Sequence, residues 1–115
     1  LSEERLAQVA ADTKVGGATL TGMLGTSAWY APGAAVSSLV QSIACDQKKM
    51  FPCSALLEGE YGLNDLTIGV PVILGKNGIE QIVEIDLDEN EKSLLAESAK
   101  GVSATNLLLA DLKLF

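Results

Sequence analysis

Apolar residues near the start of the chain recur at the spacing of one face of an α-helix. Ser2 precedes two acids, Glu3 and Glu4, which is the arrangement of an N-cap followed by a first turn that favours negative charge. The pattern therefore predicts a helix that begins directly after Ser2. The residues at helical spacing in this stretch are Leu6, Val9, Ala10 and Thr13.

Gly16 and Gly17 interrupt this helical pattern and leave two interpretations open. Each glycine costs about 1 kcal/mol relative to alanine inside a helix, so a pair of glycines is typical of a helix end. Alternatively, the helix continues to about Leu24, and the two glycines allow another part of the protein to approach its backbone closely.

A second helix is predicted from apolar residues that recur at i, i+3, i+4, i+7 and i+8 and so form a single stripe. The stripe contains Val36, Leu39, Val40, Ile43 and Ala44, whereas Ser37, Ser38, Gln41 and Ser42 fall outside it. Pro32 suits the first turn, where a missing N–H costs nothing. The other side chains of that turn are small, which indicates either simple helix propensity or a large group lying against the turn. These small residues are Ala31, Gly33, Ala34 and Ala35.

From Met50 to Leu87 the hydrophobic period changes to two, which predicts an antiparallel meander. The turn Lys76-Asn77-Gly78 predicts a hairpin, since Asn and Gly both tolerate positive φ. Pro71 removes a donor from the strand before this turn, so we expect that strand to lie at an edge or to bulge at Pro71. The apolar positions are Phe51, Cys53, Ala55 and Leu57, then Ile68, Val70 and Val72, then Ile79, Ile82, Val83 and Ile85.

Asp88 and Glu91 predict the start of a last helix, as an Asp version of the capping box. Gly101 should weaken this helix locally. The tail from 107 to 115 is apolar on more than one face, so it packs against another part of the protein or leaves a patch that favours association. The predicted buried face consists of Leu95, Ala99, Val102 and Leu109. Two N-terminal helices, an antiparallel sheet and a C-terminal helix define an α+β fold.

Length, composition and charge restrict the classes of protein and partner. The 115 residues, 48% of them hydrophobic, suffice for one domain with a modest core. The net charge of −7 argues against nucleic acid and against an anionic membrane as partners, because both require basic patches. Cys45 and Cys53 have no spacing typical of a metal site, so we expect two reduced thiols and a cytoplasmic protein.

The sequence has no self-sufficient catalytic or cofactor motif. It has no Gly-x-Gly-x-x-Gly after a strand, and it has no histidine. Without histidine, and with only two separated cysteines, a zinc site would lack ligands. We therefore identify no catalytic residue and no metal ligand.

Three segments, in order and at set spacing, carry a family resemblance. They are residues 25–33 (Gly-Thr-Ser-Ala-Trp-Tyr-Ala-Pro-Gly), 57–62 (Leu-Glu-Gly-Glu-Tyr-Gly) and 70–78 (Val-Pro-Val-Ile-Leu-Gly-Lys-Asn-Gly). Together they resemble the C-terminal part of the substrate domain of lactate and malate dehydrogenases, most closely the lactate-dehydrogenase-like malate dehydrogenases of bacteria. The resemblance runs from about Leu1 to about Asn106.

The resemblance implies that residues 1–115 are a C-terminal substrate-domain fragment of an NAD-dependent 2-hydroxy acid dehydrogenase, without the dinucleotide-binding domain. In this reading the first helix continues through its glycines. The intact enzyme would interconvert malate and oxaloacetate, a small dicarboxylate, as a homo-oligomer. Ser27 and Ala28 would lie at the substrate, and Pro32 would pack on the nicotinamide. The proton-transferring His and the substrate-binding Arg residues of the family precede Leu1, so the fragment alone should be inactive and should not bind NAD.

Two alternatives remain beside this interpretation. Ala28 corresponds to a threonine of lactate dehydrogenases, and the lost hydroxyl opens space that suits the larger dicarboxylate. A lactate or other 2-hydroxy acid dehydrogenase nevertheless remains possible on this segment. A stand-alone oligomerisation module would use the same amphipathic helices, but it would not need the pocket-like run from Ser27 to Gly33.

Overall fold

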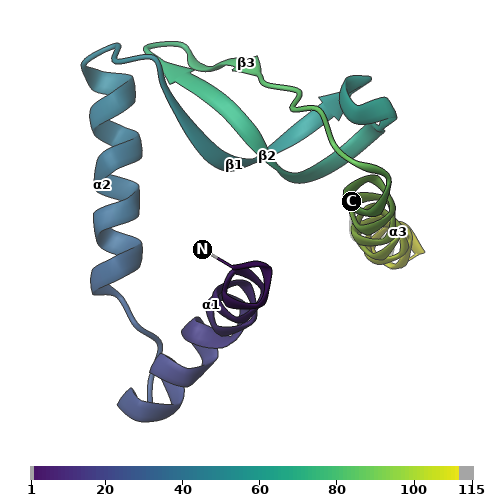
Figure 1. The fold of residues 1–115 in the computed structure, drawn as a ribbon. Coiled ribbons are helices and arrows are strands. Elements are labelled where there is room, and N and C mark those ends of the chain that lie inside the picture. The colour runs from purple at the N-terminus through teal and green to yellow at the C-terminus, as the bar shows by residue number, and fades with distance from the viewer. Residues whose placement is uncertain (1, 112–115) are drawn as a thin grey trace. The chain divides into compact units, whose positions relative to one another are not determined.

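The structure of the chain is a computed structural model that describes residues 2–111, with side chains through residue 108. The elements follow the order α1 (Glu3–Leu24), α2 (Tyr30–Ala44), β1 (Lys49–Glu58), the 3-10 helix η1 (Glu60–Gly62), β2 (Asn64–Gly75), β3 (Gly78–Ile82) and α3 (Glu89–Asp111) (Figure 1). The predicted α+β fold is confirmed. The chain divides into two compact units, Leu1–Ser38 and Leu39–Phe115, so that α2 contributes to both.

α1 begins and ends where its capping residues require. The Ser2 hydroxyl accepts a hydrogen bond from the Arg5 N–H at 3.3 Å, as predicted for an N-cap. The helix passes through Gly16 and Gly17 without a break. The interpretation in which it continues to about Leu24 is therefore confirmed, and the one in which it ends at the glycines is wrong. It ends at Gly25, whose φ of +66° places it in the left-handed region that favours glycine. No residue of α1 is buried.

α2 contains Pro32 in its first turn as predicted, but its burial differs from the prediction. Val36, Val40 and Ile43 of the apolar stripe are exposed, and Leu39 is partly buried. The fully buried residue is Ser42, which was predicted to lie outside the stripe. Its hydroxyl donates to the Leu74 carbonyl at 2.9 Å. This hydrogen bond explains the difference, because a polar group can be buried at low cost when it is paired.

The three strands form an antiparallel sheet in the order β1-β2-β3. The side of the sheet that carries the predicted alternating residues is covered by α3, which contacts β2. Leu57 and Val72 are completely buried, and Phe51 and Cys53 are partly buried against the same cluster. The buried hydrophobic cluster consists of Ala55, Leu57, Leu66, Ile68, Val70, Val72, Leu74 and Ala99.

The predicted hairpin joins β2 to β3, with Gly75 paired to Gly78. Only Gly78 takes a positive φ, of +89°, whereas Asn77 is not among the residues with positive φ. The tip is therefore not a turn in which Asn and Gly both have positive φ, although the hairpin itself is confirmed. The pairing shifts between Ile73 and Leu74, which leaves Glu80 as the extra residue of β3.

The expectation that Pro71 marks an edge or a bulge is wrong. β2 is the central strand, and Pro71 lies directly opposite Pro52 in regular pairing with β1. Two prolines can face each other where an antiparallel ladder places no hydrogen bond between the paired residues. On its other side, the Pro71 carbonyl accepts from the Val83 N–H at 2.9 Å.

Pro71 has no N–H to donate to the neighbouring Val83, and a side-chain hydroxyl makes this hydrogen bond instead. The Tyr61 hydroxyl donates to the Val83 carbonyl at 2.8 Å and accepts from the Ile85 N–H at 3.1 Å. β3 itself ends at Ile82, so the predicted third apolar run extends beyond the strand. Val83 keeps one backbone hydrogen bond to Pro71 of β2, and Tyr61 supplies the hydrogen bonds to the Val83 carbonyl and the Ile85 N–H.

α3 starts with the predicted capping box. The Asp88 carboxylate accepts from the Glu91 N–H at 2.8 Å, and the Glu91 carboxylate accepts from the Asp88 N–H at 2.9 Å. The helix is continuous through Gly101. Its predicted inner face packs on the sheet through Leu95, Ala99 and Val102. The Leu109 side chain and residues 112–115 of the predicted apolar tail lie outside the described part of the structure.

Candidate functional site

The connection between α1 and α2 contains the residues that the sequence singled out. Gly25 ends α1, and the Gly33 N–H donates to the Trp29 carbonyl at 2.8 Å, which starts α2. Only residues 25–29 therefore separate the two helices. Because both ends are fixed by backbone geometry, Ser27 and Ala28 have defined positions just before α2.

An apolar hollow of about 300 Å³ lies beside this connection, within the first unit. It is lined by Leu20, Leu24, Ala28, Trp29, Tyr30 and Ala31. Of the predicted site residues, the half-buried Ala28 lines the hollow, whereas Ser27 and Pro32 are exposed and lie outside its lining. The structure thus brings one of the three predicted residues to this hollow, and their roles remain predictions.

The lining of this hollow suits binding rather than bond-breaking chemistry. It contains no carboxylate, imidazole, amine or thiol, and the Tyr30 phenol is its single ionisable group. Such a surface can contribute shape and apolar contact to a ligand, but it offers neither a general base nor an activated nucleophile. Among residues 2–111, no three His, Cys, Asp or Glu side chains gather where a metal ion could be held.

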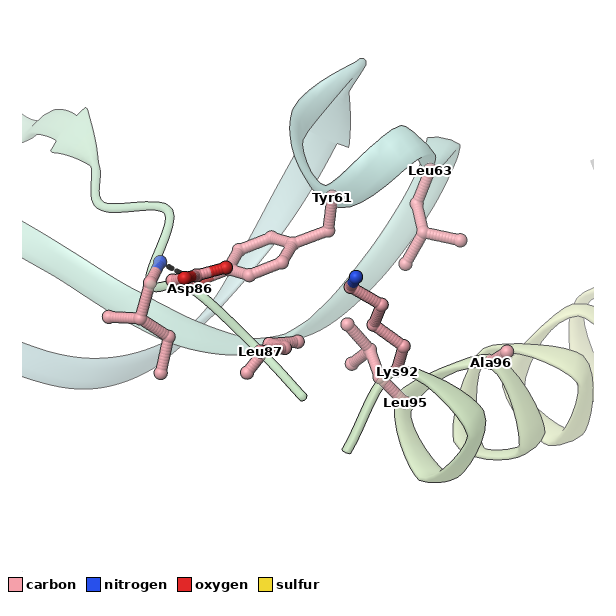
Figure 2. Close-up of a pocket in the computed structure, with 8 residues that line it drawn as sticks. Tyr61, Leu63, Asp86, Leu87, Lys92, Leu95 and Ala96 are labelled. Carbon is pink, nitrogen blue, oxygen red and sulfur yellow. Dashed lines mark hydrogen bonds between the residues drawn. The ribbon is translucent and has the colours of Figure 1, made fainter. Parts of the chain in front are cut away.

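A second hollow of about 260 Å³ lies in the second unit, between η1, the segment after β3 and α3 (Figure 2). Tyr61 forms part of its wall. The backbone φ of Tyr61 is +54°, which is uncommon for residues other than glycine. The Tyr61 N–H donates to the Glu84 carboxylate at 2.7 Å, which helps to fix this conformation. The sequence analysis missed this hollow, because spacing alone does not show that Tyr61 reaches the segment after β3. Its lining includes Tyr61, Leu63, Leu87, Lys92, Leu95 and Ala96.

The acids around η1 are not a catalytic pair. The Glu58 N–H donates to the Glu60 carboxylate at 2.7 Å. This hydrogen bond, with the backbone N–H of Glu60 itself, holds the pKa of the Glu60 carboxyl below its ordinary range. A general acid at neutral pH would need a raised pKa, so Glu60 is suited to capping the turn rather than to proton transfer.

Comparison with known proteins identifies the relatives of this chain. Residues 1–106 match the family described as lactate/malate dehydrogenase, alpha/beta C-terminal domain. The chain is 66% identical over 111 residues to a malate dehydrogenase of Bacteroides thetaiotaomicron, covering 96% of this chain and 36% of that protein. It is 65% identical over 106 residues to a malate dehydrogenase of Flavobacterium johnsoniae, covering 92% and 34%. The chain thus spans about a third of the length of these curated relatives.

Solved structures agree with this fold. The malate dehydrogenase of Salinibacter ruber superposes with a TM-score of 0.94 at 43% identity, over 98% of this chain and 37% of that one. The lactate dehydrogenase of Eimeria maxima, solved with NADH and oxamate, superposes with a TM-score of 0.92 at 37% identity, over 100% and 37%. The fold alone therefore does not separate the two kinds of dehydrogenase.

Proposed function

The chain belongs to the lactate/malate dehydrogenase family as its alpha/beta C-terminal domain, and we propose that it serves as the substrate and oligomerisation domain of an NAD-dependent malate dehydrogenase. The observation that carries the proposal is the identity of 66% to a bacterial malate dehydrogenase over 96% of the chain. The intact enzyme would interconvert malate and oxaloacetate. The cytoplasm is the proposed location, supported by Cys45 and Cys53 being free thiols.

Under the proposal, the first turn of α2 lies against the nicotinamide ring. Pro32 is exposed there, and a Cβ added at Gly33 would meet nothing within 4 Å. The nicotinamide, when bound, supplies the hydride chemistry. Under the proposal, Pro32 orients that ring by apolar contact, and Ser27 and Ala28 shape the end of the pocket that holds the dicarboxylate. In the family that the chain resembles, a histidine moves the hydroxyl proton. The sequence has no histidine, so under the proposal another part of the enzyme supplies it.

The alternative substrate class is lactate or another 2-hydroxy acid. The similarity to the Eimeria maxima lactate dehydrogenase supports this alternative, since that structure superposes nearly as well as the malate dehydrogenase of Salinibacter ruber. Under the proposal, Ala28 favours the dicarboxylate over lactate, because the corresponding residue of lactate dehydrogenases is a threonine, which would fill room that the alanine leaves. The larger pocket suits a dicarboxylate.

Ala28→Thr in the full-length enzyme tests the substrate assignment. The added hydroxyl and methyl should raise the barrier for oxaloacetate, measured through kcat/KM, by roughly 1–3 kcal/mol with little change in NAD affinity. Ala104→Thr, on an exposed position of α3 outside the proposed site, is the matched control. Unchanged kcat/KM with a lowered Tm would mean that Ala28 is a packing residue, and the substrate-pocket proposal would fail.

The contribution of the rest of the enzyme is tested with the 115-residue chain alone. It should neither turn over malate nor bind NAD, because the glycine-rich phosphate loop and the histidine are not in its sequence. Micromolar affinity for NAD in isothermal titration would contradict this.

Self-association of the same chain is proposed from the exposed α2 residues Val36, Val40 and Ile43. Sedimentation at several concentrations should show association. A monomer throughout the concentration range would remove the proposed oligomerisation role of this stripe.

A further inference from the structure

The tip of the β2–β3 hairpin places an asparagine before a glycine at an accessible position. Asn77 is exposed, and a Cβ added at Gly78 would meet nothing within 4 Å. Residue 78 has no side chain that could hinder an approach to its backbone nitrogen. The side-chain carbonyl carbon of Asn77, Cγ, and the Gly78 nitrogen therefore belong to neighbouring residues with open space around them.

We propose that Asn77 is a site of spontaneous covalent modification, in which its side-chain amide becomes a carboxylate under the restraint of Glu80. The Gly78 nitrogen attacks Asn77 Cγ, so that a new N–Cγ bond closes a five-membered imide. The Cγ–Nδ2 bond breaks, and the amide nitrogen leaves as ammonia with the proton that Gly78 gives up. Water then adds to either imide carbonyl, and the ring opens to aspartate or to its isomer linked through Cγ. No oxidant or reductant is required.

Glu80 restrains the side chain that must move. The Asn77 side-chain N–H donates to Glu80 Oε1 at 3.2 Å, and Glu80 Oε2 pairs with Lys48 Nζ at 3.4 Å. The Glu80 carboxylate thus contacts the leaving nitrogen and is itself anchored. A hydrogen bond to a charged group is stronger than one between neutral groups, so Asn77 must give up a favourable contact before Cγ can turn towards Gly78. Glu80 slows the reaction.

The product would disturb the hairpin tip. A carboxylate at residue 77 has no N–H to donate, and it would face Glu80 with like charge. Asp46 is also close, because a Cβ at Gly75 would overlap the carboxylate oxygens of both Glu80 and Asp46. Asp46 in turn accepts from the Lys76 N–H at 3.0 Å. A further negative charge beside Glu80, in a tip that already holds Asp46, should loosen the pairing of β2 with β3.

Mass spectrometry of the aged protein tests the site. Cleavage after Lys76 and Lys92 gives one peptide, residues 77–92, which contains both Asn77 and Asn90. Asn90 precedes Glu91, whose side chain hinders the same attack, so it serves as an internal control. During incubation at mildly alkaline pH, we expect conversion at Asn77 to exceed conversion at Asn90 many-fold. Equal conversion at the two residues would overturn the proposal.

The restraint by Glu80 is tested with two variants and a control. Glu80→Ala should accelerate conversion of Asn77 several-fold, and Glu80→Gln, which keeps an acceptor oxygen without the charge, should give an intermediate rate. Glu97→Ala removes the same charge from an exposed position of α3 and should leave the rate unchanged. The rate at Asn90 should stay constant in all three, which excludes general unfolding as the cause. An unchanged or slower rate in Glu80→Ala would overturn the role of Glu80. The test reads no enzyme activity and is independent of the proposed function.

Discussion

The two units of the chain place their apolar side chains differently. Among residues 2–38 none is buried, and Leu6, which lies on the predicted apolar face of α1, is 51% exposed. In the second unit, Leu57 and Val72 are completely buried within a continuous cluster. The same helical or strand periodicity therefore has two meanings in this chain. In the second unit it builds a core, and in the first it provides surface that, under the proposed function, the rest of the enzyme would cover.

Truncating one leucine in each unit should give the largest contrast. Leu57→Ala leaves a cavity in the cluster and should lower the free energy of unfolding by about 2–5 kcal/mol. Leu6→Ala removes a side chain that is already half exposed and should change it by less than about 0.5 kcal/mol. Urea denaturation of the 115-residue chain measures both. Equal losses would mean that the two units share one core.

Removing one tyrosine hydroxyl from each unit should give the next largest contrast. Tyr61→Phe deletes the group that bridges Val83 and Ile85, and should lower the free energy of unfolding by about 1–3 kcal/mol, since Pro71 has no N–H to replace it. Tyr30, at 89% exposed, is the matched control, and Tyr30→Phe should have almost no effect. Hydrogen exchange at the Ile85 amide should accelerate in Tyr61→Phe alone. Unchanged protection of the Ile85 amide would contradict the proposal that the Tyr61 hydroxyl holds the segment after β3.

Two serines on α2 allow the same comparison within a single helix. Ser42→Ala removes the buried hydrogen bond to the Leu74 carbonyl and should cost about 1 kcal/mol. The Ser38 hydroxyl donates to the Ala34 carbonyl on an exposed face, so Ser38→Ala should be close to neutral. Thermal unfolding of both variants measures the difference. If the two variants were equally stable, burial of Ser42 would not contribute to anchoring α2.

Most of the fold could be predicted from local sequence signals. Ser2 and Asp88 fix helix starts, and the alternation around Ala55, Leu57 and Val70 gives the inner face of the sheet. These features depend on neighbours in sequence, which a single chain displays directly.

The remaining features depend on contacts that are distant in sequence. Pro71 alone predicts an edge or a bulge, because nothing local shows that Pro52 lies opposite it or that Tyr61 supplies the missing donor. Ser42 was assigned to the outside because its partner Leu74 is 32 residues away. The candidate site has the same limit. Ala28 lines an apolar hollow. Under the proposed function, the groups that complete a substrate pocket would come from the rest of the enzyme, so the role of Ala28 rests on the family resemblance and on the kinetic test above.

The smallest predicted effect concerns the pH dependence contributed by Glu60. Because hydrogen bonds from the Glu58 N–H and from its own N–H lower its pKa in the folded chain, the charged carboxylate favours folding. This contribution is fully present above the ordinary glutamate pKa of the unfolded chain, and it is lost as the pH falls through the lowered folded pKa. The carboxylate is exposed, so solvent screening keeps the effect small. The stability difference between the wild type and Glu60→Gln should therefore shrink as the solution is acidified, measured by urea denaturation at several pH values. Glu97→Gln corrects for the change in net charge. A difference that stayed constant or grew on acidification would show that Glu60 does not stabilise this turn through its charge.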